Sequence, residues 1–193
     1  MGGLAIAIAP TWAQVEMTPL VVAFSGKSGS GKSTISTSLA DRLGWKRASF
    51  GGYVRRVAAE RGLTESIESL QDLGAELVAN GLAQFCRGVL EAANWRTGEP
   101  LIVDGVRHSE VLETLRALTA PSRVILVFVT VGEAERFARL QDRGMKDQSR
   151  LAKIESHSIE RQVQDALRAL ADLVVDSGTS LERALETILA RLR

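Results

Sequence analysis

The feature that most constrains this chain is a glycine-rich segment, GKSGSGKST, at residues 26–34. It follows the apolar run LVVAFS at 20–25 and precedes an amphipathic stretch at 35–43. The spacing GxxxxGK[ST] between a strand and a helix is typical of a loop that binds phosphate. Its glycines let successive backbone N–H groups curve around the anion, and the helix directs its positive end toward it. The segment therefore predicts binding of a nucleoside triphosphate.

The side chains of this loop have separate expected roles. Lys32 is expected to reach the β- and γ-phosphates, and Ser33 to bind Mg²⁺. Lys27 occupies a variable position of the pattern and is expected to be exposed. The other contacts to ATP are expected from the small residues of the loop, namely Gly26, Ser28, Gly29, Ser30, Gly31 and Thr34.

Apolar strands alternate with amphipathic helices along the rest of the chain. Strands are predicted at 20–25, 45–50, 100–104, 124–129 and 173–175. Helices are predicted at 34–43, 53–61, 67–77 (with Thr64 as the N-cap), 82–95, 110–118, 133–142, 151–170 and 181–192, and Gly51-Gly52 is expected to break the chain before the second of them. Strands that are continuous apolar runs indicate a parallel sheet covered on both faces. The predicted fold class is α/β, a three-layer fold with a five-stranded parallel sheet.

The length and charge of the chain narrow the possibilities. Its 193 residues suit one domain, which we expect at 18–193, after an N-terminal extension at 1–17 that lacks the basic region of a secretory signal. With 24 Lys and Arg against 23 Asp and Glu, the net charge of +1 gives no reason to expect a nucleic-acid polymer or a membrane as partner. The single cysteine, Cys86, suits a reducing, cytoplasmic location and is expected to be a small core residue.

Asp104 helps to separate the classes of phosphate-loop protein. It ends an apolar strand, as expected of a Walker B aspartate that holds Mg²⁺, but Gly105 follows where an ATPase would carry a glutamate to activate water. The chain has neither an Asn-Lys-x-Asp segment for guanine nor an LSGGQ-like segment. These features favour phosphoryl transfer to a bound small molecule over plain hydrolysis.

From about residue 20 to 192 the chain resembles the nucleoside monophosphate kinase superfamily of P-loop kinases. The branches it is most similar to are the cytidylate-kinase-like, deoxynucleotide-kinase-like and dephospho-coenzyme-A-kinase-like ones. Three segments carry the resemblance: SFGGYVR at 49–55 resembles SxGDxxR, LQDLG at 70–74 resembles LQxLG, and DGVR at 104–107 resembles DG-x-R. The resemblance implies that Arg55 and Arg107 bind the acceptor phosphate, with Arg107 also contacting the transferred group. Gly52 stands where many members carry aspartate, and Arg55 has the alternative interpretation of an exposed helix charge.

The segment RLQDR at 139–143 resembles the arginine pair at the start of the family's short lid, which would occupy residues 144–149. This implies that Arg139 stacks on adenine and that Arg143 contacts phosphate during transfer; the alternative is a solvated helix end. Arg150 is either a further lid arginine that binds substrate or part of a salt-bridged helix face. The turn DSGT at 176–179, with Gly178, resembles a loop that contacts the base of ATP through its backbone.

The resemblance implies an ATP- and Mg²⁺-dependent kinase that phosphorylates a small acceptor, foremost a nucleoside or deoxynucleoside monophosphate. Lys32, Asp104, Arg107 and Arg143 would be its catalytic residues, with Ser33 and Asp104 on the metal. The protein would be a monomer or homodimer. Two alternatives stay open: a hydroxyl acceptor, non-nucleotide or like dephospho-coenzyme A, for which Asp104 would serve as base, and a slow regulatory NTPase.

Overall fold

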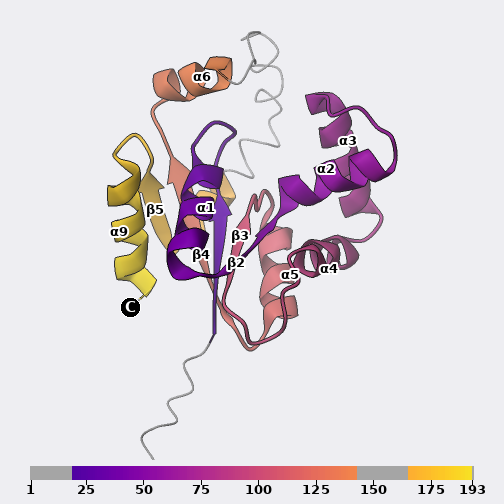
Figure 1. Cartoon of the computed structure of the whole chain (residues 1–193), viewed down its shortest axis with the longest axis horizontal. Helices are drawn as coiled ribbons and strands as arrows, with labels where there is room; N and C mark the ends of the chain where they lie inside the picture. The colour runs from indigo at the N-terminus through magenta and orange to yellow at the C-terminus, as the bar shows by residue number, and fades with distance from the viewer. Residues whose placement is uncertain (1–18, 143–164, 193) are drawn as a thin grey trace, which may run out of the picture.

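A sheet of five parallel strands forms the centre of the molecule, as the computed structural model of residues 19–142 and 165–192 shows (Figure 1). Its spatial order is β2-β3-β1-β4-β5. The strands are β1 (Leu20–Ser25), β2 (Lys46–Ser49), β3 (Leu101–Asp104), β4 (Arg123–Thr130) and β5 (Leu173–Asp176). Each lies within one residue of its predicted bounds, so the predicted α/β fold with a parallel sheet is confirmed.

Helices connect the strands and cover both faces of the sheet. They are α1 (Lys32–Leu43), α2 (Phe50–Glu60), α3 (Ile67–Ala79), α4 (Leu82–Ala92), α5 (Ser109–Thr119), α6 (Glu133–Asp142) and α9 (Leu181–Leu192). Helices α6 and α9 have the predicted bounds. Helix α6 lies above the edge of the sheet where the strands end (Figure 1).

Alternation along the strands explains the two covered faces. In β1, Val21 and Ala23 pack with α2, α3, α4 and α5 on one face, whereas Val22 and Phe24 pack with α1 and α9 on the other. All four side chains have no exposed surface. A strand buried on both faces must be apolar at every position, which is why β1 is a continuous apolar run.

The predicted start of α2 and the predicted N-cap of α3 are wrong, and the observed capping explains both. Gly51-Gly52 does not break the chain but lies in the first turn of α2, because the Ser49 hydroxyl accepts a hydrogen bond from the Gly52 backbone N at 3.1 Å. The N-cap of α3 is Ser66, not Thr64, since the Ser66 hydroxyl accepts from the Ser69 backbone N at 3.1 Å. A serine at either position satisfies an N–H group that has no partner within the helix.

One polar residue fixes the start of β5 against β4. The Asp172 backbone N donates to the Leu126 carbonyl at 2.9 Å, and its carboxylate accepts from the Leu126 backbone N at 2.8 Å. At the other end of the strand, the Ser177 backbone N donates to the Thr130 carbonyl at 2.9 Å. Strand β5 is therefore held against β4 at both of its ends, and this fixes the position of the turn that follows it.

Cys86 is a core residue on α4, as predicted, and has no exposed surface. Burial raises the pKa of its thiol to about 11. Among the helices that the structure describes, none has both the length and the apolar character to span a membrane.

Candidate active site

The phosphate loop joins β1 to α1 and adopts a conformation that needs its glycines. Gly26, Gly29 and Gly31 have φ of 141°, 81° and 84°, values that other residues rarely adopt. A side chain at Gly26 is also sterically impossible, because its Cβ would lie 2.4 Å from the Val129 carbonyl oxygen. Lys32 bends back over the loop, where its Nζ donates to the Lys27 carbonyl at 3.2 Å. Lys27 is exposed, as predicted, and its Nζ lies 2.8 Å from Glu133 Oε1.

Asp104 lies beside this loop because β3 is the neighbour of β1. It pairs in the sheet with Phe24, whose carbonyl accepts from the Gly105 and Val106 backbone N atoms at 3.1 and 3.0 Å. The Asp104 side chain is buried, and its Oδ2 accepts from Arg47 Nη2 at 2.5 Å. Its other oxygen, Oδ1, is buried without a hydrogen-bond partner among residues 19–142 and 165–192.

These residues fit the Mg²⁺ that the loop pattern implies. Magnesium prefers oxygen ligands and binds through one or two protein groups together with the phosphates of the nucleotide. The unpaired Oδ1 of Asp104 is such an oxygen, and Ser33 presents an exposed hydroxyl in the first turn of α1. The described residues contain no cluster of three or more histidine, cysteine, aspartate or glutamate side chains that would suggest another metal centre.

The two segments with the predicted acceptor arginines lie against each other. A Cβ on Gly105 would lie 3.6 Å from Phe50 Cβ and 3.9 Å from the Gly51 backbone N, so the turn after β3 touches the first turn of α2. A Cβ on Gly51 would in turn lie 3.8 Å from Arg55 Nη1. Arg55 and Arg107 are both exposed. The fold thus brings together the two segments that carry these arginines, at the carboxyl ends of β2 and β3.

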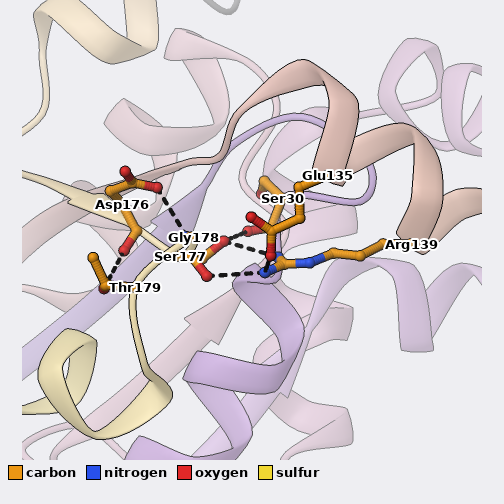
Figure 2. A network of polar contacts seen from close by, with 7 residues as sticks. All are labelled: Ser30, Glu135, Arg139, Asp176, Ser177, Gly178 and Thr179. Atoms are coloured by element: carbon orange, nitrogen blue, oxygen red, sulfur yellow. Dashed lines mark hydrogen bonds and ion pairs between the residues drawn. The ribbon is translucent and has the colours of Figure 1, made fainter.

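Arg139 lies against the turn that follows β5 (Figure 2). Its Nη1 donates to Ser177 Oγ at 2.9 Å, and its Nη2 donates to the Ser177 carbonyl at 2.9 Å and to Glu135 Oε1 at 2.5 Å. Ser177 Oγ donates to the Ser30 carbonyl at 2.6 Å. Arg139 Nη1 would be 2.9 Å from a Cβ on Gly31. Helix α6, the β5 turn and the phosphate loop therefore meet at this arginine.

The β5 turn itself has a fixed shape. Asp176 Oδ1 accepts from the Gly178 backbone N at 2.9 Å, and Thr179 Oγ1 donates to the Asp176 carbonyl at 2.8 Å (Figure 2). A Cβ on Gly178 would lie 3.1 Å from Glu135 Oε2. These contacts set the backbone of Gly178 next to Arg139 and its partner Glu135.

Two arginines that sequence reasoning missed hold this site together. Arg47 is the partner of Asp104, and Arg136 lies against the phosphate loop with 1% of its surface exposed. Arg136 Nη1 donates to the Ser28 carbonyl at 3.2 Å, and its Nε and Nη2 lie 2.8 and 2.7 Å from Glu133 Oε2. The spacing of Arg136 four residues before the buried Leu140 was the available signal that it faces inward.

Glu133 joins Arg136 to the exposed surface of the loop. Its carboxylate contacts both Lys27 and Arg136. The hydrogen bond from Lys27, followed by the bond from Arg136, holds the pKa of Glu133 below its usual range. Of the other predicted site residues, Arg143, Arg150 and the lid at 144–149 lie outside the described residues, as does the predicted extension at 1–17.

Comparison with known proteins shows the family of this chain. A family model with the description AAA domain matches residues 22–162, which is more than half of the chain. A UPF0200 protein of Aeropyrum pernix is 30% identical over 166 residues, which cover 84% of this chain and 87% of that protein. A cytidylate kinase of Haloarcula marismortui is 47% identical over 45 residues, 23% of each chain.

The fold has solved counterparts among kinases of small molecules. The structure of shikimate kinase from Acinetobacter baumannii, in complex with shikimate, matches with a TM-score of 0.54 and 17% identity over 92% of this chain and 94% of that one. At this identity the match shows the fold alone. The chain belongs to the UPF0200 family, within the P-loop nucleoside monophosphate kinase-like superfamily.

Proposed function

We propose that the protein is an ATP- and Mg²⁺-dependent kinase that transfers the γ-phosphoryl group of ATP to a nucleoside or deoxynucleoside monophosphate. The observation that carries the proposal is the contact between Gly105 and the first turn of α2, since Arg107 follows Gly105 in the chain and Arg55 lies one turn further along α2. Two exposed cations at the carboxyl ends of β2 and β3 suit an acceptor that is itself a phosphate. A hydrolase would have no use for a second anion site.

The chemistry asks mainly for position and positive charge. Transfer of a phosphoryl group involves little covalent work by the protein, and its rate depends on holding donor and acceptor in line and neutralising the oxygens of the transferred group. Lys32 supplies one charge to the β- and γ-phosphates. Arg107 supplies another on the acceptor side, and Arg143 would add a third from the end of α6. Mg²⁺, held by Ser33 and Asp104, would neutralise further charge on the phosphates.

ATP and acceptor would occupy opposite sides of the loop. The base of ATP would lie against the face of the Arg139 guanidinium, beside the turn at Gly178, because a planar guanidinium can stack on a ring. The acceptor would lie between α2 and the turn after β3. A phosphate acceptor is already ionised near neutral pH, because its second pKa is about 6, and it requires no base from the protein.

A panel of acceptors tests this proposal. Nucleoside monophosphates, deoxynucleoside monophosphates, dephospho-coenzyme A, shikimate and gluconate are each assayed for ADP release that depends on ATP and Mg²⁺, with Lys32→Ala as the inactive control. We expect turnover with at least one monophosphate and none with the Lys32→Ala variant. Turnover with a hydroxyl acceptor alone, or ADP release that no acceptor accelerates, would refute the proposed acceptor class.

A further inference from the structure

Arg47, the partner of Asp104, has no role in the proposed reaction, yet it forms hydrogen bonds to two other elements of the fold. Arg47 lies on β2, paired in the sheet across from Ile102 of β3, and 26% of its side chain is exposed. Its Nη2 donates to Asp104 Oδ2 at 2.5 Å, and its Nε donates to Ser36 Oγ at 3.0 Å. One guanidinium therefore bonds a residue of β3 and a residue of α1 at the same time.

The hydrogen bonds of Arg47 connect it to both residues proposed to hold Mg²⁺, directly to Asp104 and through Ser36 to Ser33. Ser36 lies one turn after Ser33 on α1, and its hydroxyl donates to the Ser33 carbonyl at 3.1 Å. Asp104 is held by Arg47 through one oxygen only, which leaves the buried Oδ1 without a partner among the described residues. The two proposed ligands of the metal, Ser33 and Asp104, are thus tied to each other through Ser36 and Arg47.

Because Asp104 is buried, the way in which Arg47 pairs with it determines the orientation of its carboxylate. Asp104 is 4% exposed, and a buried carboxylate that rotates to pair both its oxygens with one arginine would lose the orientation in which Oδ1 is unpaired. The bond from Arg47 to Ser36 opposes this, because it occupies Nε, the nitrogen that would otherwise join Nη2 in a side-on pair with both carboxylate oxygens. A lysine could not do the same, since its single ammonium group lacks the planar fork of donors.

We propose that Arg47 is a positioning residue of the Mg²⁺–nucleotide site, which sets the orientation of Asp104 and its place relative to Ser33. This inference rests on the proposed function, because it assumes that Ser33 and Asp104 hold the metal of the bound nucleotide. Residues that orient metal ligands typically change metal affinity or activity by about 10–100-fold when they are removed. Loss of Arg47 should therefore weaken binding that depends on Mg²⁺ and leave binding without Mg²⁺ unchanged.

Calorimetric titration with ADP tests this without turnover. Each variant is titrated with ADP once in Mg²⁺ and once in EDTA. The Kd in EDTA divided by the Kd in Mg²⁺ measures how much the metal strengthens binding. We expect this ratio to fall about tenfold or more in Arg47→Ala and by a smaller factor in Ser36→Ala. Lys46→Ala is the matched control, because Lys46 is a cation on the same strand whose Nζ bonds Glu99 Oε2 at 2.6 Å and the Asn94 carbonyl at 2.6 Å instead of Asp104.

Two further variants keep the test decisive if Arg47→Ala does not fold, since removing one partner leaves the buried Asp104 charge unpaired. Arg47→Lys keeps the charge but not the fork, and Ser36→Ala leaves both charges in place. A wild-type ratio in both of these folded variants would overturn the positioning role. If the wild-type protein itself gains nothing from Mg²⁺ when it binds ADP, the proposed metal site fails, and with it the premise of this inference.

Discussion

The guanidinium of Arg136 donates a hydrogen bond to the carbonyl oxygen of Ser28, which lies 108 positions earlier in the chain. The arginine is buried and its partner is in the middle of the phosphate loop, so helix α6 packs against the loop and supports it. A carbonyl held in this direction leaves the opposite side of the loop to its N–H groups, which are the groups that bind phosphate.

Replacement of this arginine should therefore weaken ATP binding. Arg136→Met keeps much of the length and the burial of the side chain but removes its donors. Losing a hydrogen bond from a charged group typically costs about 1.5–3 kcal/mol, which corresponds to roughly ten- to a hundredfold in binding. We expect the KM for ATP to rise by that order and the KM for the acceptor to change little. Steady-state kinetics with both substrates varied measures this, and Arg116→Met on the exposed surface of α5 is the control.

The arginines on the two sides of the phosphate loop should affect different substrates. Arg55→Ala should raise the KM for the acceptor by about ten- to a hundredfold with little change for ATP, and Arg139→Ala should do the converse. Arg107→Ala should also lower kcat, because this cation would follow the charge of the transferred group. Equal effects of all three variants on both substrates would show that the roles are wrongly assigned.

Gly26 should tolerate no side chain. Its Cβ would lie 2.4 Å from a backbone oxygen of β4, a position that cannot move without distorting the sheet. Gly44, at the end of α1, also has a positive φ, but nothing lies within 4 Å of its Cβ. We expect Gly44→Ala to lower the free energy of unfolding by about 1–2 kcal/mol, the cost of the left-handed backbone alone. Gly26→Ala should lower it by more and abolish binding of ADP, as thermal denaturation and calorimetry can determine.

The ion pairs of Glu133 should make the contact between α6 and the phosphate loop sensitive to acid. The folded protein lowers the pKa of Glu133, mainly through Lys27, so its contribution to stability is present above the pKa that this carboxyl has in the unfolded chain. That contribution is lost as the pH falls through the lower, folded pKa. We expect the difference in stability between the wild type and Glu133→Gln to be largest near neutral pH and to shrink below about pH 4.5. Denaturant titrations at pH 7 and pH 4 measure it, and a constant difference would contradict the assignment.

Cys86 should be inert in the folded protein. Its thiol is fully buried, and the pKa of about 11 leaves almost none of it as the reactive thiolate at pH 8. We expect iodoacetamide to modify the folded protein far more slowly than the protein in denaturant. Fast alkylation under native conditions, followed by mass spectrometry, would show that α4 opens readily.

Sequence reasoning predicted the sheet well because each buried strand carries its own signal. A continuous apolar run such as LVVAFS is stable only when helices cover both of its faces. The first and last residues of the strand can therefore be predicted from the run itself. The start of α2 and the N-cap of α3 were predicted less well, because Ser49, Thr64 and Ser66 are all acceptable caps and only the path of the chain selects among them.

The site was predicted in part, for a similar reason. The phosphate loop and Asp104 lie at the ends of apolar strands, where a pattern can find them. Arg47 and Arg136 have no motif: each is a lone arginine in an ordinary strand or helix, and its importance comes from partners 57 and 108 positions away in the chain. Contacts over such separations depend on the order of the strands, which a single sequence does not display.

The two hydrogen bonds between Asp172 and Leu126 influence the phosphate loop from a distance, because they fix the position of β5, and the turn after β5 contacts the loop. Neighbouring strands could slide by one residue, which would turn Val175 out of the core and Ser177 away from Ser30. The pair of hydrogen bonds at Asp172 fixes the register of β5 against β4. Because the register is fixed, the length of β5 determines where the turn at Gly178 lies. A substitution at Asp172 would therefore alter the site proposed for the base of ATP at the opposite end of the strand.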